Sequence, residues 1–239
     1  MTELFCDGAS VRPESETNAV SGARKRVYQV AAQLPTKVEL MGANQLSERP
    51  RLKFGYKLVD EMLAGGLQLG RVSEWGMPVA TGVRQLFVEL LRRASLQVGE
   101  RPLLWVLGWP GIEVFAANWT RLGVDLTRVL FARSFQPLKE LRDVFLEPVF
   151  RLIILDTPKP LSRQDFAFLS HQAAKFSFHV AIFQSCLLSP EKGNVWAKVR
   201  VNVHSDLLRG LRLEAVRGGG AIQTCFVDCF SSHCLSESS

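Results

Sequence analysis

The chain has 239 residues, of which 47% are hydrophobic and 22% are charged. This length suits one domain with an appended arm and allows about 70 to 75% of the unfolded surface to be buried, and the composition excludes a disordered chain. The longest apolar runs, such as residues 152–155, are too short to cross a bilayer, and the first residues do not form a secretory signal. We therefore expect a cytoplasmic protein without membrane contact. The net charge of +6 is compatible with contact to nucleic acid or an acidic partner.

Residues 1–50 are polar and mixed in composition, and we expect them to form a partly flexible N-terminal arm. A basic cluster at Arg24, Lys25 and Arg26 precedes apolar residues at helical spacing, which predicts a short basic helix that ends before Pro35. This helix could dock on the domain or on a partner. The alternative is that the basic cluster is a solvated face.

From residue 52, strand-like and helix-like segments alternate, which predicts an α/β domain with a mostly parallel central sheet flanked by helices. The clearest helix begins at Val83, because apolar residues recur from there at i, i+3, i+4, i+7, i+8 and i+11, and Gly99 closes it. The further expected helices cover residues 112–122, 138–145 and 162–176. The expected strands cover residues 71–75, 103–107, 129–132, 151–156 and 178–183.

The last part of the chain predicts a β-meander that completes the sheet. Residues 195–203 and 211–216 alternate apolar and polar side chains, three glycines at 218–220 form a hinge, and residues 225–230 predict a terminal strand, so the sheet would end in a hairpin. We interpret the basic side chains here, such as Arg200, as a solvated face of edge strands. The predicted domains are the arm at residues 1–50, a core at 51–217, and a glycine hinge, terminal strand and flexible tail at 218–239.

The chain has five cysteines, an odd number that does not indicate a disulfide framework, so we expect reduced thiols. Cys225, Cys229 and Cys234 lie in the terminal segment, and His233 precedes Cys234. The spacing lacks the paired C-x2-C that makes a zinc prediction strong. We expect no metal and no cofactor, and metal binding by the terminal cysteines stays an open alternative.

A glycine-punctuated strand-to-helix turn stands where a phosphate-binding loop would stand. A working P-loop needs Gly, four residues and then Gly-Lys-Ser/Thr, so that backbone N–H groups surround the phosphates, the lysine reaches the terminal ones and the hydroxyl holds magnesium. Here five residues separate Gly76 from Gly82, and Val83 and Arg84 follow. Because the lysine and the hydroxyl are missing, we expect no ATPase activity.

Residues 151–156 spell Arg-Leu-Ile-Ile-Leu-Asp, a buried strand that ends in a carboxylate, as a Walker B strand does. In a nucleotide hydrolase Asp156 would help to hold magnesium, but apolar strands also end in Asp for turn and helix-capping reasons. Together with Gly76, Gly82 and Arg84, Asp156 forms a candidate remnant of a nucleotide site. Nucleotide binding through Arg84 at a helix N-terminus is conceivable, although the extra loop residue argues against a proper cradle.

Several segments together resemble the RecA-type core. Residues 58–63 resemble its Leu-Asp-x-x-Leu helix, and residues 65–71 resemble its Gly-Gly-Leu-x-x-Gly-Arg turn before the first strand and the P-loop. Residues 122–130 and 152–156 are similar to later parts of the same core. Over about residues 52–209 the layout is most similar to the ImuA group of RecA-like proteins, which are encoded with bacterial translesion polymerases.

The chain departs from an active RecA-type ATPase at a further position. The strand at residues 103–107 runs into Gly-Trp-Pro-Gly at 108–111, where an active relative would carry a catalytic glutamate, and Glu113 is displaced from that place. ATP hydrolysis needs positioned phosphates, magnesium and an activated water acting together. The resemblance therefore implies a scaffold without hydrolysis.

The resemblance implies a non-catalytic accessory protein of a damage-inducible (SOS) translesion DNA synthesis and mutagenesis complex. Its partners would be RecA, a catalytically inactive Y-family polymerase homologue and an error-prone replicative-type polymerase, with any DNA contact indirect. The candidate contact surfaces are the N-terminal arm and Arg92, Arg93, Arg209, Arg212 and Arg217. The alternative for each of these is a solvated face.

A second hypothesis is an SOS cell-division inhibitor of the SulA kind, which binds the tubulin-like division GTPase. That family also has a shortened RecA-like layout without a P-loop and a late His-Ser pair, here His204 and Ser205. This hypothesis ranks second, because the chain keeps the Gly-Gly-Leu-x-x-Gly-Arg turn at residues 65–71 and the aspartate Asp156 more fully than the SulA kind does. A nucleotide hydrolase with an unorthodox site and direct DNA binding are minor alternatives. For DNA, Trp109 is the best exposed candidate, whereas Trp75 and Trp105 are expected in the core.

Overall fold

The computed structural model describes residues 49–78, 82–97, 100–191, 194–206 and 210–228. Contacts divide the chain into a unit of residues 1–47 and a unit of residues 48–239, and the described residues belong to the second unit. The predicted basic helix of the arm lies outside the described residues. So do Arg209, Cys229, His233 and Cys234.

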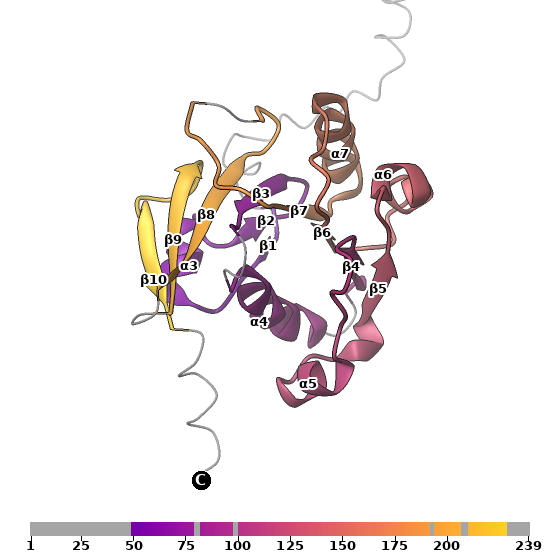
Figure 1. The fold of residues 1–239 in the computed structure, drawn as a ribbon, viewed down its shortest axis with the longest axis horizontal. Coiled ribbons are helices and arrows are strands. Elements are labelled where there is room, and N and C mark those ends of the chain that lie inside the picture. The colour runs from indigo at the N-terminus through magenta and orange to yellow at the C-terminus, as the bar shows by residue number, and fades with distance from the viewer. Residues whose placement is uncertain (1–48, 79–81, 98–99, 192–193, 207–209, 229–239) are drawn as a thin grey trace, which may run out of the picture. The chain divides into compact units, whose positions relative to one another are not determined.

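An α/β architecture with a large, mostly parallel sheet is confirmed (Figure 1). Within the described residues the sheet has eight strands in the order β10-β9-β8-β3-β7-β6-β4-β5. The strands from β8 to β5 in this order run parallel, and β9 and β10 are antiparallel to their neighbours. The strands are β3 (Val72–Gly76), β4 (Leu103–Leu107), β5 (Val129–Arg133), β6 (Leu152–Asp156), β7 (His179–Gln184), β8 (Val199–Asp206), β9 (Gly210–Arg217) and β10 (Thr224–Val227).

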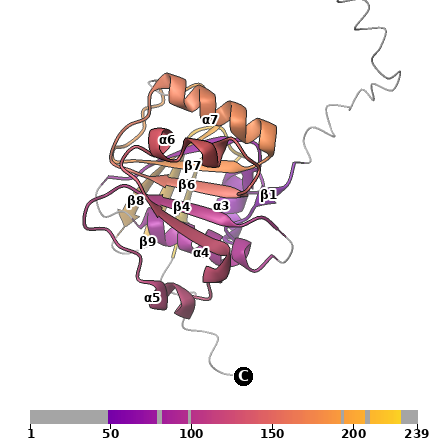
Figure 2. The ribbon, with the colours of Figure 1, turned by 90° about the vertical axis from the view of Figure 1, so that its right-hand side faces the viewer.

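Helices cover both faces of this sheet. Figure 2 shows α7 (Arg163–Phe176) on one face and α4 (Val83–Ser95) on the other. A small antiparallel pair, β1 (Arg51–Leu52) and β2 (Leu67–Gln68), flanks α3 (Lys57–Met62) before β3. The remaining helical segments are α5 (Ala116–Arg121), α6 (Pro137–Glu140) and the 3-10 turns η1 (Leu126–Arg128) and η2 (Arg142–Phe145).

The core between the sheet and α4 is aromatic. The apolar stripe predicted for this helix is confirmed, because all six of its residues from Val83 to Ala94 are buried. The ring of Phe87 lies 5.0 Å from that of Trp75 and 4.9 Å from that of Phe183, both at steep angles. Edge-to-face packing of this kind adds to the free energy gained from burial alone. Trp75 and Trp105 are buried, as predicted.

The helix α7 is held by its first turn. The Ser162 side chain accepts a hydrogen bond from the Asp165 N–H, and the Asp165 carboxylate accepts one from the Ser162 N–H, which completes a capping box. Phe166, Leu169 and Ala173 pack on the sheet, as their helical spacing predicts. Phe176 at the end of the helix is only half-buried.

Two predicted helices are shorter than expected. The segment predicted at residues 112–122 forms a helix only over α5, and the residues before α5 follow a turn at Gly111, which has a φ of +73°. The segment predicted at residues 138–145 is divided into α6 and η2. The strand predicted from residue 195 begins only at Val199, since the preceding residues cross the sheet from β7 to β8.

Next to this core, a series of buried hydrogen bonds joins β7, β3 and β2. The ring of His179 lies between two partners, with Nδ1 2.8 Å from the Gln68 carbonyl and Nε2 2.8 Å from the Ser73 hydroxyl. The Trp75 indole N–H donates to the same hydroxyl at 2.9 Å. Each group is satisfied if His179 is neutral, with Nδ1 as donor and Nε2 as acceptor. Burial lowers the pKa of His179 from 6.5 to about 4.

We expect acid to destabilise the fold through His179. Between pH 6.5 and 4 the unfolded chain binds a proton at this histidine that the folded chain does not, so the free energy of unfolding falls as the pH falls, by about 3 kcal/mol in all. Urea titrations at several pH values between 6.5 and 4 measure how steeply the free energy of unfolding changes with pH, for the wild type and for His179→Gln. We expect a steeper dependence for the wild type. The exposed His171, replaced by Gln, is the control. The same pH dependence of the free energy of unfolding in all three proteins would contradict the expectation.

Candidate functional site at the carboxyl edge of the sheet

The sequence-predicted site residues meet at the edge where the parallel strands end. Gly76 is the last residue of β3 and Asp156 the last of β6, with β7 between the two strands. Gly82 is the N-cap of α4, and Arg84 lies in the first turn of that helix. In open α/β sheets, ligands bind outside the carboxyl ends of the strands. The topology therefore places these residues where a nucleotide site would lie.

An ion pair joins the helix to the strand. The Arg84 guanidinium donates from Nε to Asp156 Oδ2 at 2.7 Å and from its terminal nitrogen to Oδ1 at 2.8 Å. The Asp156 side chain is 0% exposed and that of Arg84 is 34% exposed. The Trp105 indole N–H also lies 3.4 Å from Oδ2. A two-pronged contact of this kind is the strongest geometry between arginine and a carboxylate.

This ion pair occupies the carboxylate that a magnesium site would use. In a P-loop protein the hydroxyl in the first helical turn and the Walker B aspartate hold magnesium between them. Here Gly82, Val83 and Arg84 stand in the order of Gly-Lys-Ser/Thr, so Arg84 takes the place of the hydroxyl residue rather than that of the lysine. Val83, in the place of the lysine, is fully buried in the core. The guanidinium of Arg84 thus supplies the positive charge beside the buried Asp156 carboxylate.

The two glycines of the predicted site are in contact with protein atoms. A Cβ on Gly76 would collide with Asn202 Oδ1 and would lie 2.9 Å from the Cys186 carbonyl oxygen. A Cβ on Gly82 would lie 2.9 Å from a methyl group of Leu211. Gly76 therefore needs glycine because a backbone carbonyl lies beside it, whereas at Gly82 the flexible Leu211 side chain would have to move, and neither glycine has a positive φ.

Next to this site, a second buried ion pair was missed by the sequence analysis. Arg200 donates from Nε to Glu74 Oε2 at 2.9 Å and from a terminal guanidinium nitrogen to the Ser189 carbonyl at 2.9 Å. Burial raises the pKa of Glu74, and the contact with Arg200 opposes this rise. The prediction that Arg200 lies on a solvated edge strand is wrong, because β8 lies between β3 and β9 inside the sheet. The alternation of residues 195–203 indicated a strand but not its place in the sheet.

Side chains of β8 also hold the loop that follows β7. The Asn202 side chain accepts a hydrogen bond from the Leu188 N–H at 2.7 Å and donates one to the Leu188 carbonyl at 3.0 Å. Together with the bond from Arg200 to Ser189, these contacts hold the loop against β8. Side chains rather than a helix therefore satisfy the backbone of this crossover.

The four described arginines among the predicted partner contacts lie on two separate elements, α4 and β9. Arg92 and Arg93 both pair with Glu89 on α4, at 2.6 and 3.0 Å, and line a groove of about 520 Å³ with residues of β1. Arg212 and Arg217 are exposed on β9, and Arg217 donates to the Asn194 carbonyl at 3.4 Å. The pairing with Glu89 reduces the positive charge that Arg92 and Arg93 offer to a partner.

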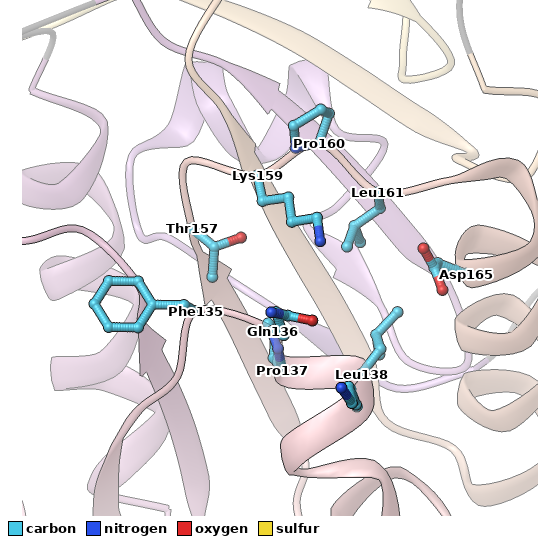
Figure 3. Close-up of a pocket in the computed structure, with 10 residues that line it drawn as sticks. Phe135, Gln136, Pro137, Leu138, Thr157, Lys159, Pro160, Leu161 and Asp165 are labelled. Carbon is cyan, nitrogen blue, oxygen red and sulfur yellow. The ribbon is translucent and has the colours of Figure 1, made fainter.

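A pocket of about 190 Å³ lies at the same edge of the sheet, beyond β5 and β6 (Figure 3). Thr157 follows Asp156 directly and lines it. The other lining residues are Phe135, Gln136, Pro137, Leu138, Lys139, Lys159, Pro160, Leu161 and Asp165. The sequence analysis did not single out these residues. Their signal is a proline-rich, lysine-containing loop after each of two consecutive strands.

Other predicted chemistry is not assembled in the part of the chain that the structure describes. In that part no group of three or more His, Cys, Asp or Glu side chains could hold a metal ion. Cys186 and Cys225 are free thiols, and burial raises the pKa of Cys225 to about 11. Trp109 is half-buried rather than exposed. None of the helices in the described segments has both the length and the apolar character needed to cross a membrane.

Comparison with models of protein families finds no match for this chain, and comparison with curated proteins finds no significant match.

We expect the ion pair between Arg84 and Asp156 to stabilise the fold. The substitution Arg84→Met leaves a buried carboxylate without its partner and is expected to lower the free energy of unfolding by about 2 to 3 kcal/mol. Adding Asp156→Asn should restore about 1 kcal/mol or more, because the charge is then removed. Urea denaturation of the single and double variants measures this coupling.

The control for this experiment is Arg93→Met. Arg93 also pairs with a carboxylate, but its side chain is 45% exposed, so its loss should cost less than about 1 kcal/mol. An Arg84→Met variant as stable as Arg93→Met would show that the pair is energetically neutral.

Proposed function

We propose that this chain is a RecA-like, non-catalytic accessory protein of a damage-inducible translesion DNA synthesis complex and acts through protein–protein contacts. The strand order supports the RecA-like assignment, because the strand before α4 and the strand that ends in Asp156 reach the same edge of a mostly parallel sheet. The resemblance of residues 58–63 and 65–71 agrees with α3, which lies between β1 and β2 just before β3.

The observation that carries the non-catalytic part of the proposal is the ion pair of Arg84 with Asp156. It leaves the scaffold of a nucleotide site in place but neutralises the carboxylate that would bind magnesium. The strand β4 also ends in a Gly-Trp-Pro-Gly turn without a carboxylate, and the Glu113 side chain is 80% exposed and pairs with Arg133. Glu113 is therefore not held against the end of β4, where the resemblance would place the glutamate that activates water.

The proposed partners are RecA, a catalytically inactive Y-family polymerase homologue and an error-prone replicative-type polymerase. RecA subunits assemble by passing a segment from one core to the next, so the free edge of a RecA-like sheet is a reasonable contact. The strand β5 forms such an edge, since in the described residues it pairs with β4 alone. Leu130 on this strand is 47% exposed. An exposed sheet edge can accept a further strand from a partner.

We expect the purified protein not to hydrolyse ATP, with or without single-stranded DNA and RecA. The reason is that the segment between β3 and α4 lacks the Gly-Lys-Ser/Thr order of a P-loop, and the Asp156 carboxylate is paired with Arg84. Phosphate release measures the turnover. Turnover that Asp156→Ala abolishes would overturn the proposal, because Asp156 would then act on the nucleotide despite Arg84.

We expect the protein to co-purify with RecA or with the inactive polymerase homologue, and Leu130→Lys to weaken this association about tenfold by placing a charge on the β5 edge. Leu187→Lys is the matched control, because Leu187 is exposed to the same extent, at 46%, but lies in the loop after β7. Pull-down and titration calorimetry provide the measurements. A protein that associates with neither partner, and instead causes filamentation when overproduced, would favour the cell-division inhibitor.

A further inference from the structure

The pocket beyond β5 and β6 is formed by two short connections that leave the carboxyl edge on either side of β4. One connection, from Ser134 to α6, follows β5, and the other, from Thr157 to the start of α7, follows β6. Figure 3 shows the side chains of both connections converging on one space between α6 and α7. The pocket is therefore built by parts of the chain that the parallel sheet brings together.

The walls of the pocket are held in place. Pro137 begins α6, and Pro158 and Pro160 restrict the backbone of the second connection. The Ser134 hydroxyl donates to the Glu140 carboxylate at 2.5 Å, which fixes the first connection to α6. A pocket with rigid walls loses little conformational entropy when it is filled.

Polar groups that could bind an anion and apolar side chains both line the pocket. In Figure 3 the ammonium group of Lys159 and the hydroxyl of Thr157 point into the space, and Leu138 and Leu161 approach it from opposite sides. Among the described residues, neither Lys159 nor Lys139 forms an ion pair. The Asp165 carboxylate on the lining already accepts hydrogen bonds from Ser162. The unsatisfied charge of the pocket is therefore positive.

The size of the pocket limits what can fill it. Pockets for nucleotides and other drug-sized ligands have volumes of about 300 to 1,000 Å³. The volume here is about 190 Å³, which is too small for a nucleotide and suits one or two side chains. Anchor residues of protein partners commonly fill pockets on a protein surface.

We propose that this pocket receives an acidic residue and its large apolar neighbour from a protein partner. The carboxylate contacts the Lys159 ammonium and the Thr157 hydroxyl, and the apolar side chain lies between Leu138 and Leu161. This assignment rests on the proposed function in one respect, because it takes the ligand to be a protein. It does not depend on which protein of the complex supplies the residues.

The direct test uses a minimal probe, the capped dipeptide N-acetyl-Asp-Phe-amide, titrated into the isotopically labelled full-length chain to about 10 mM. We expect amide chemical-shift changes at Thr157 and Leu161 that fit a dissociation constant of about a millimolar. The capped dipeptides Asn-Phe and Asp-Ala should each bind about five- to tenfold more weakly, because one lacks the charge and the other the apolar anchor.

Variants of the chain separate a specific contact from general attraction. Lys159→Gln should weaken Asp-Phe binding about five- to tenfold and leave Asn-Phe binding unchanged. Lys198→Gln removes the same charge from an exposed position outside the pocket and should change neither. The proposal is overturned if no shifts occur at the pocket, if Asp-Phe and Asn-Phe bind equally, or if adenosine monophosphate binds there more tightly than Asp-Phe.

The same variants distinguish failure of this inference from failure of the proposed function. If the dipeptide binds but neither RecA nor the polymerase homologue co-purifies, the pocket stands and the proposed partners are wrong. If a partner co-purifies equally with the wild type and Lys159→Gln, and the dipeptide does not bind, the proposed function stands and the pocket is not its anchor.

Discussion

A carboxylate that is fully buried at the end of a parallel strand needs a positive charge beside it, and the fold satisfies Asp156 with Arg84. The cost of leaving such a charge unpaired is several kcal/mol, so the pair constrains where α4 begins relative to β6. The helix in turn supplies Phe87 to the aromatic core that it shares with Trp75 and Phe183. The ion pair of Arg84 with Asp156 thus links the carboxyl edge of the sheet to the packing of α4 on one face of the sheet.

The same principle operates on the other side of β3. Glu74 and Arg200 neutralise each other between adjacent strands, and Arg200 and Asn202 satisfy the backbone of the loop after β7. These contacts explain why Gly76 is a glycine, since Asn202 occupies the space beside it. The carboxyl edge at β3 and β8 is therefore filled by the protein's own side chains, as it is at Arg84.

The sequence predicted the α/β class and the apolar face of α4 because both depend on periodicity within a short segment. It also predicted that Arg84 and Asp156 belong to one region, since a helix after a strand and the end of a buried strand share an edge in parallel sheets. It could not predict that Arg84 reaches Asp156 rather than a phosphate, because 72 residues separate them and β7 intervenes. Arg200 was misplaced for a similar reason. An alternating segment indicates a strand, but only strand order shows whether that strand lies at an edge.

The ion pair of Arg84 with Asp156 also affects the segments that follow β6. In nucleotide hydrolases, segments at the carboxyl edge change position because they contact a phosphate that is bound and then lost. In this chain the charge beside Asp156 comes from Arg84, which is part of the protein and does not leave. The end of β6 and the connection that begins at Thr157 are therefore always next to the same charge. If the proposed function holds, the pocket next to Asp156 is then always formed, and the presence of this protein in a complex depends on its abundance rather than on a nucleotide cycle.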